Sequence, residues 1–461
     1  MNYRTRFPAD SRPVETALVG AGAFGRSFLG QGRRMPLMNA RIAVDRDAAI
    51  AAAAFAAIGV PDAEVASCGT PEEASAAWNA GRCIATGSLD AVLHLPFDIL
   101  VEASGHPEAG AAMARSAIEH GKHVALVSKE VDSVVGGLLS ARAEARDVVC
   151  TPVDGDQPAL LIDLVTWAET LGMEVIAAGK SSEYDFVYDP ETGRITTEAG
   201  VAEVPEFGEV WELGSGPVAE TLARRTAMAR LPTVAVPDLC EMAVVANATG
   251  LVPDVPGFHA PILRVTEIPT AFDVAQEGGI LAGSRRIDVF NCLRLPHETS
   301  FAGGVFVTVR CTDADTWALL KGKGHVVSRS GTCGLVYLPR HLLGLEAPIS
   351  VLDAVLHRVS VAGRVTPRVD LVARATADLP EGHMLAMGGH HHSIADVAPE
   401  LLPAAPLHAD RPAPFYLISN RTLRRPVRKG QAITFADVAI PEDAPLLRLR
   451  REQDALFPVA P

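Results

Sequence analysis

The stretch GKSSEYDF at residues 179–186 follows an apolar run and places a lysine, two serines, a glutamate, a tyrosine and an aspartate within eight positions. The ammonium and hydroxyl groups could bind an anionic group or stabilise an enediolate-like charge, and the carboxylates could move a proton or ligate a divalent metal. We therefore expect this segment to carry chemistry. The candidates are Lys180, Glu183 and Asp185 for catalysis, Glu183 as a metal ligand, and Ser181 and Ser182 for substrate binding.

Two further loops carry comparable groups. The loop VDGDQP (153–158) offers Asp154 and Asp156 as hard oxygen ligands of the kind that Mg²⁺ or Mn²⁺ prefers. Asp156 and Gln157 are also substrate-binding candidates. A turn whose aspartates bond their own backbone is the simpler alternative. The glycine-rich segment LLKGKGHVVSRSG (319–331) combines cations, hydroxyls and backbone N–H groups that suit a phosphate or a carboxylate. A solvated turn is the alternative there.

A glycine-rich turn follows the first apolar strand, in ALVGAGAFGRSFL. Its GxGxxG spacing between a strand and a helix allows a tight turn, the approach of a pyrophosphate and close packing of helix on strand. Asp45 at the end of the second strand could bind an adenine ribose, whereas the adjoining Arg46 could hold a 2′-phosphate, so NAD and NADP both stay open. The predicted cofactor-binding residues are Gly20, Gly22, Ala23, Phe24, Gly25, Asp45, Arg46, Ser104, Gly105 and Lys129.

Lys129 has a second expected role because it follows a strand end that borders the same crevice. An ammonium near the nicotinamide would polarise a carbonyl or steady a developing alkoxide, which makes Lys129 a catalytic candidate. A surface lysine that caps a helix is the alternative.

The elements that must position these groups fall into three regions. Residues 1–150 alternate short apolar runs with alanine-rich helical patterns, which predicts a doubly wound parallel sheet of the Rossmann type. Residues 151–345 have the mixed texture of an α+β catalytic domain, with a strand in MEVIAAGK and a helix from Val236 to Gly250. Residues 346–461 are rich in proline and short strand-like pieces, which indicates a small β-rich module.

Composition limits the function further. The chain has 461 residues, 48% of them hydrophobic, and a formal net charge of −14, so a nucleic-acid partner is not expected. No segment has the length of an unbroken membrane-spanning run or a signal peptide. The seven cysteines form no CxxC pair and indicate a reduced compartment, and we expect a cytoplasmic protein.

Two tempting features are not assigned a function. The three consecutive histidines 390–392 would alternate faces on an extended segment, so we expect them to be solvated and without a structural role rather than metal ligands. Cys150 and Cys240 lie inside apolar runs and are expected to fill the core.

The order of DILVEASG, GKHVALVSKE, TPVDGDQPALL and AAGKSSEYDF resembles the layout of homoserine dehydrogenases. It is still more similar to their relatives, the DXR-like (DRL) proteins, which act as 1-deoxy-D-xylulose 5-phosphate reductoisomerases. The resemblance covers most of the chain and includes a C-terminal SAF-like domain matched by RRPVRKGQAITFADV. It implies a homodimer, a small anionic sugar-like substrate, a place in isoprenoid biosynthesis, and substrate contacts from Lys323 and His325.

One departure argues against homoserine as the substrate. The dehydrogenases carry an aspartate and, one helical turn later, a lysine that together serve the substrate and hydride transfer. Here the matching helix reads PDLCEMAVVA, in which Asp238 is present as a catalytic candidate but Met242 replaces the lysine. The chemistry is therefore expected to have shifted.

The leading hypothesis is an NAD(P)H-dependent reductoisomerase that rearranges and reduces a keto-sugar such as 1-deoxy-D-xylulose 5-phosphate. A related alternative is an oxidoisomerase of a branched sugar acid such as apionate, and plain homoserine dehydrogenase ranks third. A hypothesis from another class is a non-catalytic nucleotide-binding scaffold. Mg²⁺ or Mn²⁺ could assist the rearrangement through Glu183 and Asp156.

Overall fold

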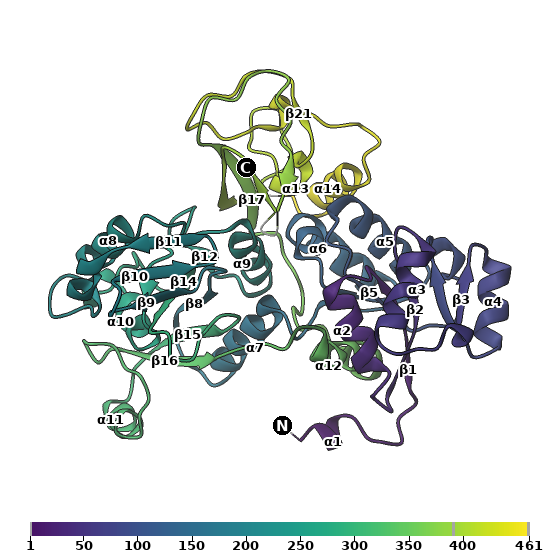
Figure 1. Ribbon diagram of the computed structural model, residues 1–461, viewed down its shortest axis with the longest axis horizontal. Coiled ribbons are helices and arrows are strands. Elements are labelled where there is room, and N and C mark those ends of the chain that lie inside the picture. The colour runs from purple at the N-terminus through teal and green to yellow at the C-terminus, as the bar shows by residue number, and fades with distance from the viewer. Residues whose placement is uncertain (1, 390–391, 459–461) are drawn as a thin grey trace.

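The computed structural model describes residues 2–389 and 392–458, which form three parts (Figure 1). The N-terminal part contains a seven-stranded sheet in the order β3-β4-β2-β1-β5-β6-β7, and all its neighbouring strands are parallel. The strands are β1 (Val14–Val19), β2 (Met38–Val44), β3 (Val65–Cys68), β4 (Cys83–Thr86), β5 (Ile99–Glu102), β6 (His123–Leu126) and β7 (Cys150–Pro152).

Helices cover both faces of this sheet, which confirms the predicted doubly wound fold. One apolar core lies between the sheet and α2 and α3, and another lies between the sheet and α5 and α6. The helices of this part are α1 (Tyr3–Arg6), α2 (Ala23–Gly32), α3 (Ala48–Ala57), α4 (Pro71–Asn79), α5 (Pro107–Glu119) and α6 (Lys129–Ala145). Because parallel strands end at the same edge of a sheet, the loops after β1, β2, β5, β6 and β7 gather there.

The central part is a mixed sheet with helices α7 and α9 between it and the rest of the molecule (Figure 1). Its main path runs β11-β10-β9-β14-β8-β15-β16, and β12 and β13 also pair with β14. The strands are β8 (Val175–Ser181), β9 (Phe186–Asp189), β10 (Arg194–Thr197), β11 (Gly200–Glu203), β12 (Val252–Pro253), β13 (Ile262–Leu263), β14 (Arg286–Arg294), β15 (Val305–Arg310) and β16 (Cys333–Leu338). The helices are α7 (Gln157–Thr170), α8 (Val218–Ala229), α9 (Val236–Thr249), α10 (Ile268–Ala271) and α11 (Ala314–Gly322).

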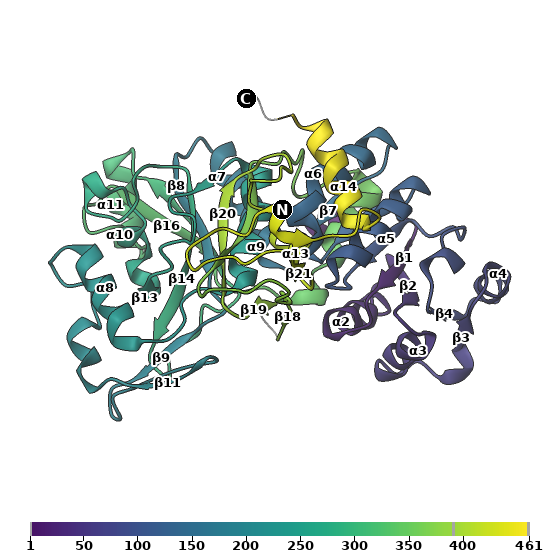
Figure 2. The same ribbon diagram turned by 90° about the horizontal axis from the view of Figure 1, so that it is seen from above.

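The C-terminal part lies over the junction of the other two, as Figure 2 shows from above. Its helix α14 packs on α5 and α6, and its strands β17 and β20 pack on α9. Among its described residues, this part contains three antiparallel strand pairs and two α-helices. They are β17 (Val369–Ala375) with β20 (Val397–Pro403), β18 (Met387–Gly388) with β19 (Ser393–Ile394), β21 (Thr422–Leu423) with β22 (Val438–Ala439), α13 (Phe415–Ile418) and α14 (Pro445–Leu456).

Some details differ from the sequence-based expectations. Strands β3 and β4 were not predicted, because four-residue strands leave too little pattern to recognise. The first four residues of the glycine-rich segment 319–331 belong to α11 rather than to a turn. Residues 347–354, placed by the sequence at the start of the C-terminal module, pack into the N-terminal core through helix α12 (Pro348–Leu352). In the described part of the chain, no helix combines the length and the hydropathy that a membrane span requires.

Candidate active site

The glycine turn after β1 is shaped for a dinucleotide. Gly20 has a φ of +91°, and a Cβ there would lie 2.2 Å from the Ala103 carbonyl oxygen. A Cβ at Gly25 would lie 2.1 Å from the Gly20 oxygen, so both positions need glycine for the fold itself. Gly22 differs, because a Cβ there would meet no atom within 4 Å. Its backbone, directly before Ala23 at the start of α2, is therefore open to a ligand at a helix N-terminus.

The other predicted cofactor residues line the same edge. Asp45 accepts a hydrogen bond from the Ala21 N–H at 2.7 Å, which ties the end of β2 to the glycine turn. The Arg46 side chain is 91% exposed and free to reach a phosphate group. After β5, the Gly105 N–H donates to the Ser128 hydroxyl at 2.9 Å. Ser104 donates to Glu102 and Phe24 lies on the first turn of α2, so the predicted set occupies one strand-end edge.

Two lysines from different domains meet at one carboxylate. Lys129, the first residue of α6, and Lys180, on β8, each form an ion pair with Glu241 of α9, one at each carboxylate oxygen. Lys180 and Glu241 are enclosed, whereas the Lys129 side chain keeps 24% of its surface open. This pairing joins the N-terminal part and the central part through two ion pairs.

The charges in this cluster stabilise one another. Burial alone would raise the pKa of the Glu241 carboxyl, but the two ammonium groups lower it to about 2. Burial would likewise lower the pKa values of Lys129 and Lys180, yet the surrounding carboxylates raise both above the ordinary lysine value. Both lysines are therefore cations throughout the neutral pH range.

Asp238 holds in place the polar turn, by which we mean residues 180–185. Its carboxylate accepts hydrogen bonds from the Ser182 hydroxyl at 2.7 Å and from the Ala235 N–H at 2.9 Å, and it lies 3.1 Å from the Lys180 ammonium. With its oxygens so fully used, Asp238 is arranged to position Lys180 and the turn. Met242 is buried in the core, so the ammonium beside Asp238 comes from β8 and not from the helix.

The two aspartates of the DGD loop lie in different surroundings. Asp156 caps α7 and its other oxygen lies 3.9 Å from the Lys129 ammonium, so it belongs to the cluster. Asp154 accepts a hydrogen bond from the Ser350 hydroxyl at 3.0 Å, on the side of α12. Gln157 donates to the backbone carbonyls of Ser181 and Gly304, and so holds the end of β8.

The remaining polar-turn residues point in several directions. Glu183 lies 3.5 Å from the Lys180 ammonium and keeps 26% of its side chain exposed, whereas Asp185 pairs with Arg294 at 2.7 Å. The Ser181 hydroxyl is buried and finds no hydrogen-bond partner among the described residues, so it is a donor available to a ligand.

The residues do not fit the expected metal. Within residues 2–389 and 392–458, no three His, Cys, Asp or Glu side chains are placed to hold a metal ion. Lysine ammonium groups already lie against the carboxylates that were candidate ligands, Glu183 and Asp156. We therefore derive no step through a metal.

Lys323 and His325 lie outside the cluster. They are exposed, just after α11, which both views place at the end of the central part opposite the nucleotide-binding sheet (Figures 1 and 2). The segment is anchored elsewhere, because Arg329 donates to Gly214 and Gly216.

The prediction for the histidine tract is wrong at His392. His390 and His391 lie outside the described residues. His392 approaches Glu130 of α6, with 3.0 Å between its Nδ1 and a carboxylate oxygen, although the angle does not suit a hydrogen bond. Its ring also meets Tyr416 edge-on. Cys150 and Cys240 are buried, as predicted.

Sequence reasoning also missed Glu241. The available signal was a glutamate three residues after Asp238 in the largely apolar helix PDLCEMAVVA. A charge inside a buried helix requires a buried partner.

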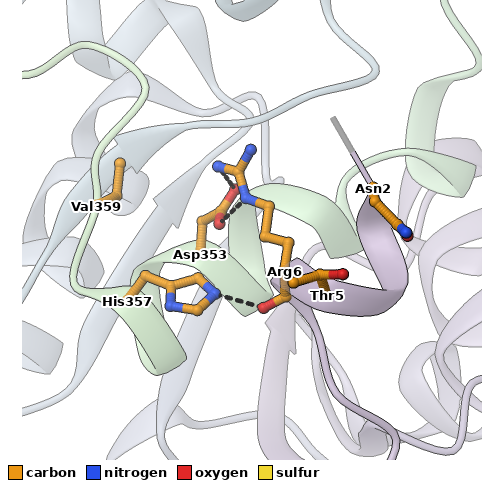
Figure 3. Close-up of a pocket in the computed structure, with 6 residues that line it drawn as sticks. All are labelled: Asn2, Thr5, Arg6, Asp353, His357 and Val359. Atoms are coloured by element: carbon orange, nitrogen blue, oxygen red, sulfur yellow. Dashed lines mark hydrogen bonds and ion pairs between the residues drawn. The ribbon is translucent and has the colours of Figure 1, made fainter.

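A separate pocket of about 460 Å³ lies near the N-terminus and contains none of the predicted site residues (Figure 3). Arg6 pairs with Asp353 through both carboxylate oxygens, and His357 Nε2 lies 2.8 Å from the Arg6 carbonyl oxygen. These groups satisfy one another and fix α1 against the segment after α12.

Two family models match the chain. Residues 20–150 match the NAD-binding domain of homoserine dehydrogenase, and residues 155–206 and 235–347 match the catalytic domain of oxidoreductase DRL. The N-terminal part of the chain is therefore similar to the NAD-binding domain of an oxidoreductase, and the central part is similar to the DRL catalytic domain. The SAF-like assignment of the C-terminal module stays a prediction.

No curated protein sequence matches the chain. Solved structures that align with it include the WlbA dehydrogenase from Bordetella pertussis with NADH and UDP-GlcNAcA, at 17% identity and a TM-score of 0.28 over 39% of this chain and 49% of that one. GenD2 from gentamicin A biosynthesis, with NAD, aligns at 16% identity and 0.34 over 76% and 88%. The 1-deoxy-D-xylulose 5-phosphate reductoisomerase from Zymomonas mobilis, with NADPH, aligns at 18% and 0.31 over 51% and 58%. The chain thus spans about half the length of the first of these.

Proposed function

We propose that the protein rearranges and reduces a small polyhydroxylated keto substrate in the manner of a reductoisomerase, such as 1-deoxy-D-xylulose 5-phosphate. The observation that carries the proposal is the pair of permanently charged lysines, Lys129 and Lys180, held by Glu241 beside the nucleotide-binding edge. Two fixed cations suit the oxyanion that forms when a carbonyl is enolised or reduced. A nicotinamide cofactor supplies the hydride.

The residues of the cluster divide the remaining work. The Lys129 ammonium, whose side chain is 24% exposed, would polarise the substrate carbonyl, and the unpaired Ser181 hydroxyl would donate to a substrate oxygen. Glu183 and Asp156 are the partly exposed carboxylates of the cluster that could exchange a proton with substrate. Asp238 and Gln157 would hold these groups in position.

A second candidate is the oxidoisomerisation of a branched sugar acid such as apionate. The position of residues 319–331 favours it, because their cations are absent from the described Lys129–Lys180 cluster and a phosphate would be expected to use several cations at once. A carboxylate requires fewer. For either substrate, a cytoplasmic homodimer remains our proposal, and the phosphorylated substrate would place the protein in isoprenoid biosynthesis.

The test is a panel of 1-deoxy-D-xylulose 5-phosphate with NADPH, and apionate and homoserine with NAD⁺ and NADP⁺, followed by absorbance at the nicotinamide wavelength. We expect turnover of one of the first two substrates and its loss in Lys180→Met, with Lys323→Met as the matched control. Fosmidomycin would inhibit only the phosphate-dependent reaction. Because the carboxylates are already paired with lysines, we expect activity to persist in EDTA. Tight dinucleotide binding without turnover of any of the three would favour the scaffold alternative.

The choice of cofactor depends on Arg46. Its exposed side chain beside Asp45 is the nearest predicted partner for a 2′-phosphate. We therefore expect Arg46→Ala to weaken NADPH binding roughly 10-fold, the loss of about one charged hydrogen bond, and to leave NADH binding unchanged. Equal loss of both dinucleotides in fluorescence titrations would contradict this assignment.

A further inference from the structure

The segment HLLGLE at residues 341–346 crosses between the two halves of the site, on the way from β16 to α12 (Figure 1). On one side its Leu343 carbonyl passes so close to the DGD loop that a Cβ at Gly155 would lie 1.9 Å from that oxygen. On the other side, a Cβ at Gly344 would lie 2.8 Å from the Phe24 carbonyl of α2. The segment therefore fills the space between the loop that carries Asp156 and the helix that starts the dinucleotide site.

His341 opens this segment with its ring held in a defined orientation. Its Nδ1 lies 2.8 Å from the Gly303 carbonyl oxygen. Because a carbonyl can only accept, Nδ1 carries the hydrogen, and Nε2 keeps a lone pair in the neutral ring or a second N–H in the charged one. No described residue forms a hydrogen bond with Nε2.

The position next to the His341 ring requires a glycine at residue 303. Its φ is +82°, and a Cβ there would lie 2.5 Å from His341 Nδ1. The neighbouring Gly304 carbonyl accepts from Gln157 and from the Ser181 N–H, so the turn that holds the imidazole also holds the end of β8.

The turn that holds the imidazole also contacts the loop of the charged cluster. Gln157, the residue after Asp156, donates to the Gly304 carbonyl at 3.2 Å, next to the glycine that holds His341. Asp156 in turn lies 3.9 Å from the Lys129 ammonium. An oriented histidine with a free Nε2 is thus connected, through the Gly303–Gly304 turn, to the loop that carries Asp156.

We propose that His341 is the acid–base residue of this site, and that segment 341–346, not segment 319–331, forms its second wall. In the rearrangement, Nε2 accepts the proton of a substrate hydroxyl as its carbon becomes a carbonyl. The C–C bond at that carbon breaks and re-forms at the former carbonyl carbon, whose oxygen takes the proton back from Nε2. Hydride from the reduced nicotinamide cofactor then converts the new carbonyl to an alkoxide, which takes a proton from solvent. This inference rests on the proposed function and adds a residue to it.

The test compares His341→Asn with His325→Asn. Asparagine at 341 keeps a side-chain N–H that can reach Gly303 but has no Nε2, so the variant separates positioning from proton transfer. On whichever substrate is turned over, we expect kcat to fall at least about 100-fold in His341→Asn, with NADPH affinity within about twofold of the wild type. His325→Asn should match the wild type. Wild-type kcat in His341→Asn, or an equal loss in His325→Asn, would overturn the inference.

A second measurement needs no substrate, so it separates this inference from the proposed function. In protein with ¹³C-labelled histidines, the two variants identify the signals of His341 and His325 by their disappearance. We expect NADPH to shift the His341 signal and to leave that of His325 in place. A shift of His325 alone would overturn the inference even if none of the tested substrates were turned over.

Discussion

At the scale of single residues, Glu241 determines the character of the site. One carboxylate lies between two ammonium groups that come from different domains, and its low pKa shows that it stays ionised. The lysines are therefore fixed electrostatic groups rather than proton donors. Proton transfer must fall to groups with other surroundings, such as Asp156, Glu183 or His341.

Asp132 allows a test of the burial argument. It lies three residues after Lys129 in α6, and a Cβ at Gly136 would lie 1.8 Å from one of its oxygens, so the buried carboxyl folds back onto its own helix. Burial raises its pKa to about 7. The folded protein thus binds the proton more tightly than the unfolded chain, and stability falls as the pH rises from about 4 to about 7.

We therefore expect Asp132→Asn to stabilise the protein by up to about 4 kcal/mol at pH 8, and the gain to vanish near pH 4. Urea unfolding at a series of pH values measures this, with the exposed Asp62→Asn as the control. A variant that is less stable than the wild type at pH 8 would show that the ionised carboxylate has a favourable partner.

The sequence predicted the cluster in part. Lys129 and Asp156 follow the ends of β6 and β7, whereas Lys180 lies on β8. The edge rule for parallel strands was enough to expect Lys129 at the nucleotide crevice. Residues 319–331 misled because glycines and cations are common to phosphate loops and to solvated helix ends. The position of His341 depends on how the chain runs from β16 past α2 to α12, and local sequence patterns do not encode that path.

At the scale of elements, α2 shows how a helix start can be left open for a ligand. Gly20 and Gly25 are required by neighbouring backbone atoms, whereas Gly22 faces empty space with an ordinary φ of −69°. The GxGxxG spacing and the strand before it could be predicted from the sequence, because each of the three positions requires glycine for its own steric reason.

Gly22→Val should therefore separate folding from binding. The apo protein should unfold within about 0.5 kcal/mol of the wild type, as for a surface substitution, because the side chain meets no protein atom. Dinucleotide affinity should fall at least about 10-fold, since the methyl groups occupy the space expected for the pyrophosphate. Thermal unfolding with and without NADPH measures both, and Gly20→Val, which clashes with Ala103, should unfold at a clearly lower temperature. Unchanged affinity in Gly22→Val would place the dinucleotide elsewhere.

At the scale of the whole molecule, the C-terminal part joins the other two. Arg450 of α14 is enclosed and pairs with Asp370 of β17 and with Asp454, while Gln453 donates to the Val134 carbonyl of α6. His392 approaches Glu130 from the same part. The proline-rich sequence indicated a small β-rich module, but its docking face depends on buried charges that have no periodic pattern.

Adjacent arginines provide a matched test of this docking. Arg450→Ala would leave Asp370 buried without its partner and should destabilise the protein by about 3–5 kcal/mol. Arg451 pairs with Glu442 at the surface, so Arg451→Ala should cost at most about 1 kcal/mol. Urea unfolding compares them, and similar losses for both would mean that the Arg450 pair contributes no more than a surface one.

The bridge formed by α14 on one side and by β17 and β20 on the other has a consequence for ligand entry. The C-terminal part contacts both the N-terminal part and the central part, so it holds these two parts at a fixed separation. A hinge rotation that swings the nucleotide-binding sheet away from α9 would have to tear one of those contacts. We therefore expect a ligand to reach the two lysines by movement of short connecting segments rather than by rotation of a whole domain.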